Sequence, residues 1–360
     1  MRVIITAGGT GGHIYPALAI LNKIKEKEPQ SEFLYIGTTD RMEKEIVPEK
    51  GIPYIGIEMK GLDRKKIWRN IKVLQIYFQA IKKAKEEIKK FDPDLVIGVG
   101  GYITTPVIYA AKKLGYKTMI HEQNAIPGVS NKILSRYADR ILVSFEESKA
   151  SFPKEKTVYT GNPRSEEMVE MAKGKKEELG FSKNKKLIII VMGSLGSMTM
   201  TQKLKELVPS FAKKDYEVLL VTGKDYYKDY ETLTIPKNVK VVPFYDAKYM
   251  KSCDLIITRS GASTIAEITA IALPSIMVPS PYVTHNHQMK NALALEKEGA
   301  CKIISEENFE KDIVLKEIDT LLNQKGTYQK MKKALEKFAI TDSAERIYKE
   351  AKKLVRDEKE

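Results

Sequence analysis

Short apolar runs alternate along the chain with longer segments in which apolar residues recur every three or four positions. The short runs are rich in Val, Ile and Leu, which is typical of strands that are buried on both faces of a parallel sheet. They predict strands at residues 2–6, 33–36, 51–57, 95–98, 117–120, 140–143 and 156–160, and again at 186–192, 218–221, 239–242, 255–257 and 275–278. Because predicted helices separate them, each half of the chain is expected to form a doubly wound parallel α/β sheet.

One turn-rich segment, Gly-Asn-Pro-Arg at residues 161–164, interrupts this repeating pattern. A chain of 360 residues is too long for one small core, and such a segment is typical of an inter-domain linker. We therefore expect a first domain at residues 1–162 and a second at 163–340. The charged helix predicted at residues 341–360 is expected to pack back on the first domain.

Three glycine-rich turns follow predicted strands, at residues 7–13, 98–102 and 193–196. Glycine is needed where φ is positive or where a ligand approaches the backbone, so these turns indicate phosphate-facing loops. The first turn is not a dinucleotide fingerprint, because Ile14 stands where the last glycine of that motif belongs. No Gly-Lys-Ser/Thr follows it, so it is not a P-loop either. His13 lies at the end of this turn, where it can act as a base or orient a ligand.

The segment at residues 254–267 combines a strand, a small-residue turn and a helix. Free backbone N–H groups and the helix dipole favour an anion at such a turn. Glu267 lies one turn into the helix, where a carboxylate can reach sugar hydroxyls. The alternative is that Thr264 and Glu267 form a capping box and bind only the backbone.

Polar side chains also cluster after two other predicted strands. His-Glu-Gln-Asn at residues 121–124 follows one strand, and the carboxyl ends of parallel strands are where α/β ligand sites form. Gln288 and Asn291 follow the strand at 275–278 and share one helix face. Asp92-Pro93-Asp94 offers two carboxylates, but we interpret it as the end of a helix.

The net charge of the chain is +14, which predicts anionic partners. Residues 60–90 hold eleven basic and three acidic residues around an amphipathic helix that contains the single tryptophan. This pattern predicts contact with an anionic membrane surface through Trp68, Ile71, Leu74 and Phe78. The alternative is a stripe that faces the core, with a solvated basic side. Nucleic acid ranks last, because no recognition motif with interleaved aromatic residues is present.

Other features indicate a protein of the reducing cytosol. Cys253 and Cys301 are the only cysteines and are expected to be buried structural thiols. No apolar run approaches the roughly 18–20 residues of a membrane-spanning helix. The first predicted strand begins at once, which leaves no room for a signal peptide.

The motifs together resemble those of the MurG-type glycosyltransferases, which add N-acetylglucosamine to the lipid-linked muramyl-pentapeptide precursor of the bacterial cell wall. The resemblance covers nearly the whole chain. It rests on Gly-Gly-Thr-Gly-Gly-His (8–13), Gly-Gly-Tyr (100–102), His-Glu-Gln-Asn (121–124), Gly-Asn-Pro (161–163), Gly-Ser-Leu-Gly (193–196) and the segment from 254 to 291. It implies a GT-B fold, with two Rossmann-like domains and the site in the inter-domain cleft.

By this resemblance the second domain binds UDP-N-acetylglucosamine. Glu267 is expected to bind the ribose, the backbone near Tyr245 the uracil, and Gln288 the sugar hydroxyls. Ser194 and its loop are expected to hold the diphosphate, with added charge from Arg164. Ser263 and Thr264, at the start of the same helix as Glu267, are also placed at the donor. No cofactor and no metal ion are implied.

The resemblance assigns the acceptor to the first domain. Thr10, Gly11, Gly12 and Asn124 are expected to close over the donor sugar and the acceptor, while Tyr102 and Glu122 line the acceptor side. In an inverting transfer a base must take the proton of the attacking hydroxyl, and developing charge on the diphosphate must be stabilised. Our hypothesis is that His13 is the base, with Glu122 as the second candidate.

Two departures from the family pattern weaken single assignments. Arg164 follows Pro163 directly, where the family often has one more residue, and Thr201 stands where many members have Asn. The expected location is the cytoplasmic face of the bacterial plasma membrane, as a peripheral protein of peptidoglycan synthesis that serves cell shape and division.

Three alternatives remain open from the sequence. A different enzyme on the same kind of sheet, such as an NAD-dependent oxidoreductase or an epimerase, is disfavoured by the failed dinucleotide fingerprint. A transferase with another lipid acceptor, such as diacylglycerol, differs only in acceptor-side residues. A non-catalytic membrane-bound scaffold would bind membranes without affinity for uridine nucleotides.

Overall fold

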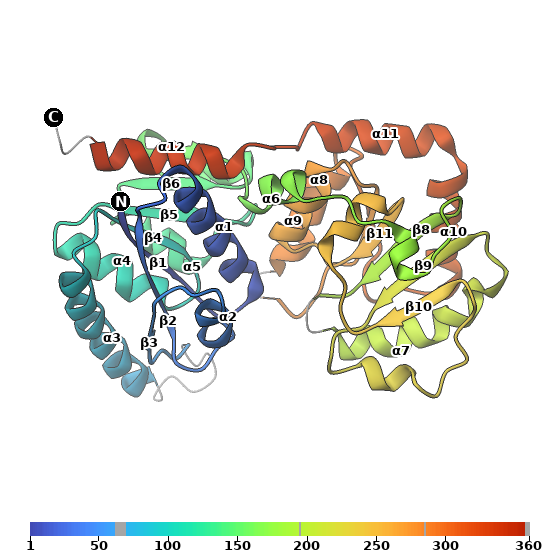
Figure 1. Cartoon of the computed structure of the whole chain (residues 1–360), viewed down its shortest axis with the longest axis horizontal. Coiled ribbons are helices and arrows are strands. Elements are labelled where there is room, and N and C mark those ends of the chain that lie inside the picture. Colours follow the sequence, from blue (N-terminus) through green and yellow to red (C-terminus); the bar gives the residue numbers. More distant parts are fainter. Residues whose placement is uncertain (62–69, 194–195, 284–285, 357–360) are drawn as a thin grey trace. The chain divides into compact units, whose positions relative to one another are not determined.

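The computed structural model describes residues 1–61, 70–193, 196–283 and 286–356, and it divides into two compact units (Figure 1). The first unit contains Met1–Arg164 together with Asp342–Glu360, and the second contains Ser165–Thr341. The chain therefore leaves the first unit once and returns to it with its last helix.

The first unit is built on a seven-stranded parallel sheet in the order β3-β2-β1-β4-β5-β6-β7. Its strands are β1 (Arg2–Ala7), β2 (Glu32–Thr38), β3 (Tyr54–Ile57), β4 (Leu95–Gly100), β5 (Thr118–Glu122), β6 (Arg140–Val143) and β7 (Thr157–Tyr159). β1 pairs with both β2 and β4, so the strand order reverses between β1 and β4. Ligand sites of open α/β sheets form at this kind of switch point, outside the carboxyl ends of the strands.

Helices cover both faces of this sheet. They are α1 (Gly11–Lys27), α2 (Glu43–Glu49), α3 (Asn70–Phe91), α4 (Thr104–Lys113), α5 (Val129–Leu134) and α12 (Ser343–Arg356). One buried cluster joins the sheet to α1 and α12, and a second joins its other side to α3, α4 and α5. The six residues of β4 are all buried, as expected for a central strand between two helical layers.

The second unit has a six-stranded parallel sheet in the order β10-β9-β8-β11-β12-β13. Its strands are β8 (Lys186–Val191), β9 (Tyr216–Val221), β10 (Val239–Val242), β11 (Leu255–Thr258), β12 (Ser275–Met277) and β13 (Lys302–Ile303). Its α-helices are α6 (Arg164–Glu170), which begins at the last residue of the first unit, α7 (Met198–Leu207), α8 (Ala262–Ala270), α9 (His287–Glu296), α10 (Lys311–Asn323) and α11 (Lys325–Glu336). Here the strand order reverses between β8 and β11, which pair with each other in parallel.

These two sheets confirm the prediction of two doubly wound parallel α/β domains. The prediction that Asp92-Pro93-Asp94 ends a helix is also confirmed, since α3 ends at Phe91 and Asp92 takes a positive φ of 49°. The predicted strand at 51–57 is shorter than expected, because β3 begins only at Tyr54, after Pro53, which has no N–H to donate. The two-residue strand β13 was not predicted; it is too short to give a periodic signal.

The last helix, α12, packs on α1 of the first unit. Ile347 and Ala351 are fully buried in the same cluster as Leu21 and Ile24 of α1. Glu28, at the end of α1, accepts hydrogen bonds from Tyr348 and Lys352 of α12. An apolar stripe and a polar contact thus join the two ends of the chain, and the first unit needs α12 to complete its core.

We expect Ile347→Ala to lower the free energy of unfolding of the first unit by about 2–5 kcal/mol, because it opens a cavity in a filled core. Calorimetric melting of the whole protein measures the change. Lys349→Ala on the same helix is the control; its side chain is 63% exposed, and a change within about 0.5 kcal/mol is expected. A similarly small effect of Ile347→Ala would contradict this packing role.

Candidate functional site

Two glycine-rich turns meet at the switch point of the first unit. The N–H of Gly8, after β1, donates to the carbonyl oxygen of Gly100 at the end of β4, at 3.2 Å. Gly101 has a φ of +90°, and a Cβ on it would lie 2.4 Å from the carbonyl oxygen of Gly8. No side chain fits at this contact, so glycine is required for the two turns to touch.

His13 lies in the first turn of α1, beside this contact. Its Nδ1 is 3.1 Å from the carbonyl oxygen of Gly8, and its ring fills the space that a Cβ on Gly100 would need. A carbonyl oxygen only accepts, so Nδ1 donates and the neutral ring carries its lone pair on Nε2. The turn thereby fixes both the orientation of the ring and the nitrogen that can take up a proton.

The first turn of α1 supplies backbone donors next to His13. Thr10 is the N-cap in extended conformation and makes no side-chain capping bond, and no acidic residue lies in the first turn. Gly11 and Gly12 bring no side chain to this turn. The positive end of a 17-residue helix is therefore framed by Thr10, Gly11 and Gly12, and it favours negative charge there.

A buried carboxylate that the sequence did not single out holds this turn in place. Glu43, the first residue of α2, is fully buried and accepts the N–H of Gly9 at 3.1 Å. Its other oxygen accepts the N–H and the hydroxyl of Thr38 at 3.0 and 2.7 Å. Nothing in the sequence distinguishes Glu43 from Glu45 and Glu49 on the same short helix.

Glu122, at the end of β5, is a second buried carboxylate. One oxygen accepts the backbone and side-chain N–H groups of Asn124 at 2.9 and 3.2 Å. The other accepts the N–H of Gly128 at 3.0 Å and the amide of Asn131 at 2.9 Å. With both oxygens occupied and only 2% of the residue exposed, this geometry favours a role in shaping the loop over a role as base.

His121 and Gln123 of the same motif point into the protein rather than toward a ligand. His121 is fully buried; its Nε2 donates to the carbonyl oxygen of Gly161 at 3.0 Å, and its Nδ1 accepts from Gln123 at 3.1 Å. Burial lowers the pKa of His121 to about 4, and the hydrogen bond to Gly161 only partly opposes this. The neutral ring therefore joins β5 to the segment around Gly161.

Tyr102 is exposed and Arg164 is half-buried in the first unit. Tyr102 is 63% exposed, and its ring lies against Gly61. The guanidinium of Arg164 lies over the ring of Tyr15, at 5.7 Å from its centre. The backbone N–H of Arg164 donates to the Oδ1 of Asn162 at 3.1 Å. Arg164 is thus held close to the first turn of α1 by a cation–π contact.

An apolar surface lies on α3 and α5 of the first unit. Leu74 and Phe78 are 51% and 66% exposed, and Val129 and Ile133 of α5 are 55% and 50% exposed. A hollow of about 180 Å³ is lined by Tyr77, Phe78, Ile81, Thr105, Tyr109, Ile133, Leu134 and Tyr137. Trp68 and the side chain of Ile71 lie outside the described residues. The contribution of α5 was not predicted, because a six-residue helix shows too little periodicity.

In the second unit the helix that carries Glu267 begins earlier than predicted. α8 starts at Ala262, and its N-cap is Gly261, so Thr264 is the third helical residue and not a cap. The capping-box alternative for Glu267 is therefore wrong. Thr264 and Glu267 are half-buried, and the Oγ of Ser263 is buried without a hydrogen-bond partner among the described residues.

Gln288 is anchored through one end of its amide. Its Oε1 accepts the N–H of Ser280 at 2.8 Å, and its carbonyl oxygen accepts the hydroxyl of Ser260 at 2.9 Å. The amide of Asn291 donates to the carbonyl oxygen of Ser260 at 3.3 Å. These bonds fasten α9 to the turn before α8 and leave the NH₂ of Gln288 as the end that can donate to a ligand.

The third glycine-rich turn packs on the loop after β9. Gly196 has a φ of +80°, and a Cβ on it would lie 2.1 Å from the carbonyl oxygen of Thr222. Ser194 lies outside the described residues. Thr201 is buried and donates to the carbonyl oxygen of Ser197 at 2.8 Å, so its hydroxyl serves the helix. Tyr245 is half-buried in the loop after β10.

The two thiols and the acidic side chains show no metal-binding arrangement in the described part of the chain, where no group of three or more His, Cys, Asp or Glu could hold an ion. Cys301 is buried and Cys253 partly buried, and burial raises the pKa of both to about 12. Both thiols are therefore protonated at neutral pH. Among the described helices, none is long and apolar enough to cross a bilayer.

Comparison with known proteins gives the same family over both units. Residues 3–143 match the glycosyltransferase family 28 N-terminal domain, and residues 187–347 match the glycosyltransferase family 28 C-terminal domain. A protein of Bacillus licheniformis is 43% identical over 362 residues, which cover 98% of this chain and 99% of that protein. It is named UDP-N-acetylglucosamine--N-acetylmuramyl-(pentapeptide) pyrophosphoryl-undecaprenol N-acetylglucosamine transferase.

Solved structures show the same fold. Acinetobacter baumannii MurG superposes with a TM-score of 0.78 at 27% identity, over 98% of this chain and 99% of that one. A putative UDP-N-acetylglucosamine 2-epimerase from Listeria monocytogenes superposes with a TM-score of 0.71 at 17% identity, over 97% of this chain and 94% of that one. The second likeness concerns the fold alone.

The buried His121 predicts a specific pH dependence of stability. Its pKa of about 4 in the folded protein lies below the value of about 6.5 of an exposed histidine, so protonation favours unfolding. The free energy of unfolding that the neutral ring of His121 contributes is fully present above about pH 6.5. It is lost as the pH falls toward 4, at up to about 1.4 kcal/mol per pH unit.

Calorimetric melting of the first unit between pH 7.5 and 4.5 measures this slope. We expect His121→Gln to be less stable at pH 7.5 but to have a shallower slope, whereas the control His287→Gln, in the second unit, keeps the slope of the wild type. Equal slopes for the wild type and His121→Gln would show that His121 is not a buried neutral group.

Proposed function

The chain belongs to glycosyltransferase family 28, and we propose that it transfers N-acetylglucosamine from UDP-N-acetylglucosamine to the muramyl sugar of undecaprenyl-diphosphate-linked N-acetylmuramyl-pentapeptide. The reaction converts lipid I to lipid II in peptidoglycan synthesis, and it thereby serves cell shape and division. The observation that carries the proposal is the near full-length identity of 43% to a transferase whose name states both substrates.

The donor is assigned to the second unit. Glu267 lies on α8, the helix that follows β11 at the switch point of β8 and β11, and we assign it to the ribose hydroxyls. Gln288 presents its NH₂ to the sugar hydroxyls, because Ser280 already occupies its oxygen. The backbone near Tyr245 binds the uracil.

The diphosphate is assigned to the helix N-termini of the second unit. α8 begins after Gly261 with no acidic residue in its first turn, so its N–H groups and dipole favour negative charge. Ser263 has a buried hydroxyl in this turn that lacks a protein partner among the described residues, and with Thr264 it supplies donors there. Ser194 and Arg164 are the further candidates.

The acceptor and the base are assigned to the first unit. His13 takes the proton of the attacking hydroxyl through Nε2, because Nδ1 is committed to the carbonyl oxygen of Gly8. Thr10, Gly11 and Gly12 bring backbone donors to the same place. Asn124 and Tyr102 line the acceptor side, and Glu122 holds the loop that carries Asn124.

Transfer proceeds with inversion. The acceptor hydroxyl attacks the anomeric carbon from the face opposite the UDP, the bond to the diphosphate oxygen breaks, and its electrons leave on UDP. We assign the stabilisation of the charge that develops there to the backbone N–H groups at the N-terminus of α8.

The apolar surface of α3 and α5 is the proposed membrane contact, at the cytoplasmic face of the bacterial plasma membrane. Leu74 and Phe78 are more exposed than a core-facing stripe allows. Exposed Lys132 and Arg136 flank Ile133, so anionic lipid headgroups meet positive charge around the apolar residues. The protein is then peripheral and meets its lipid-linked acceptor at the membrane surface.

The test of the proposed function is the reaction itself. Purified protein is supplied with UDP-N-acetylglucosamine and with either the muramyl-pentapeptide lipid or diacylglycerol, and products are identified by mass spectrometry. A disaccharide product on the first acceptor alone is expected. Transfer to diacylglycerol alone, or no transfer, would overturn the proposal.

We expect His13→Ala to lower kcat by about 10²–10⁴-fold without changing the Kd of UDP-N-acetylglucosamine, because only proton transfer is removed. Steady-state kinetics and calorimetric titration measure the two quantities. Asn22→Ala, at an exposed position of the same helix, is the control and should behave as wild type. A kcat near that of the wild type would exclude His13 as the base.

We expect the double change Leu74→Ser and Phe78→Ser to weaken binding to anionic liposomes by roughly tenfold or more, because two exposed apolar anchors are lost. Turnover on a soluble acceptor analogue should stay unchanged. Leu293→Ser is the matched control, since Leu293 is 49% exposed in the second unit. Equal loss of liposome binding and turnover would indicate a core role for α3 instead.

A further inference from the structure

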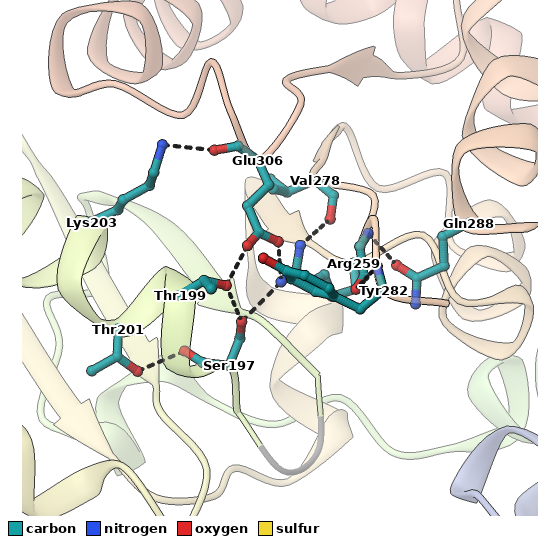
Figure 2. A network of polar contacts seen from close by, with 10 residues as sticks. Ser197, Thr199, Thr201, Lys203, Arg259, Val278, Tyr282, Gln288 and Glu306 are labelled. Carbon is teal, nitrogen blue, oxygen red and sulfur yellow. Dashed lines mark hydrogen bonds and ion pairs between the residues drawn. The ribbon is translucent and has the colours of Figure 1, made fainter. Parts of the chain in front are cut away.

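A buried ion pair lies at the carboxyl ends of the strands of the second unit (Figure 2). Arg259 follows β11 and Glu306 follows β13, and their side chains are each 8% exposed. The Nη2 of Arg259 lies 2.7 Å from the Oε2 of Glu306. Charges this deeply buried require pairing and further hydrogen bonds, and such pairs add little net stability.

The pair joins four segments of the unit. The Nη1 of Arg259 donates to the carbonyl oxygen of Val278, after β12, at 3.0 Å, and its Nη2 donates to the Oγ of Ser197 at 3.0 Å. Glu306 accepts a hydrogen bond from the hydroxyl of Thr199 in α7. Lys203 of α7 also donates to the carbonyl oxygen of Glu306 at 2.7 Å. Figure 2 shows these contacts converging between α7 and the ends of the strands.

Ser197 is where this network departs from ordinary helix architecture. It is the N-cap of α7, in extended conformation, a place where serine usually accepts an N–H of the first turn. Here its side chain makes no capping bond. Its Oγ instead accepts from Arg259 and lies 3.2 Å from the hydroxyl of Thr199. The cap is thus turned away from the N–H groups of its own helix.

We propose that Arg259 and Glu306 are positioning residues for the donor diphosphate. By holding Ser197, they keep the first-turn N–H groups of α7 available to a phosphate at the switch point of β8 and β11. Because Glu306 neutralises Arg259, the pair contributes geometry rather than net charge. This inference rests on the proposed function, since it concerns the UDP-sugar site of the same unit.

The feature to test is the guanidinium of Arg259, whose N–H donors point in fixed directions. Arg259→Lys keeps the charge but cannot bind Val278, Ser197 and Glu306 at once. We expect it to raise the Kd of UDP by about fivefold or more, as for the loss of one hydrogen bond, while the Kd of uridine changes less than about twofold. Calorimetric titration with UDP and with uridine measures both, and uridine serves as the ligand without phosphates.

A second variant keeps the test valid if Arg259→Lys folds poorly. Thr199→Val removes the hydroxyl that joins Ser197 to Glu306 and leaves the ion pair intact. It should also weaken the binding of UDP more than the binding of uridine. Thr327→Val is the matched control, since the Thr327 hydroxyl is bound only to Gln324 among described residues, and both affinities should stay as in the wild type.

The outcomes separate this inference from the proposed function. A selective loss of UDP affinity in both variants supports the positioning role. An equal loss of UDP and uridine affinity would show a general structural role and overturn it, as would unchanged UDP affinity. If the wild type binds no UDP, the proposed function fails and this inference fails with it.

Discussion

The contact between two backbone turns, after β1 and after β4, is the constraint on which the first unit's candidate site depends. Gly101 approaches the carbonyl oxygen of Gly8 so closely that a Cβ would lie 2.4 Å from it. The same carbonyl oxygen binds Nδ1 of His13, so the contact also fixes the ring. The carboxylate of Glu43 accepts the N–H of the next residue, Gly9. The backbone contact, supported by the carboxylate of Glu43, thus positions the proposed base.

In the second unit, a buried ion pair rather than a backbone contact joins the turns at the strand ends. Its turns are joined by the buried pair of Arg259 and Glu306, which reaches the segments after β8, β11, β12 and β13. A well-packed apolar pair would often be at least as stable, so stability alone does not explain two buried charges. A guanidinium does, however, bind three partners in fixed directions, which an apolar side chain cannot do.

Periodicity and turn chemistry predicted much of the fold. Short Val/Ile-rich runs gave the central strands, and the three glycine-rich turns fall at strand ends, as a parallel sheet requires. The start of α8 was missed because Gly261, not Thr264, is the N-cap, and glycine gives no side-chain signal for that role. The two-residue β13 and the six-residue α5 are too short for any period to appear.

The candidate site was predictable in position but less so in detail. His13 stands at a turn whose glycines are visible in the sequence. The sequence does not show in which direction a polar side chain points at the end of a strand. His121 and Glu122 therefore look like ligand-binding residues in the sequence, although in the structure they bind the protein's own backbone. Glu43 and Glu306 act on partners distant in the chain, at Gly9 and Arg259, and only folding brings these pairs together.

The most direct test of the donor assignment is calorimetric titration of the wild-type protein with UDP-N-acetylglucosamine, UDP-glucose and NADH, without added metal. We expect selective binding of UDP-N-acetylglucosamine, with weaker binding of UDP-glucose and none of NADH. Absence of uridine nucleotide binding, or a preference for NADH, would contradict the assignment of Glu267 and Gln288 to the donor, and with it the proposed transferase activity.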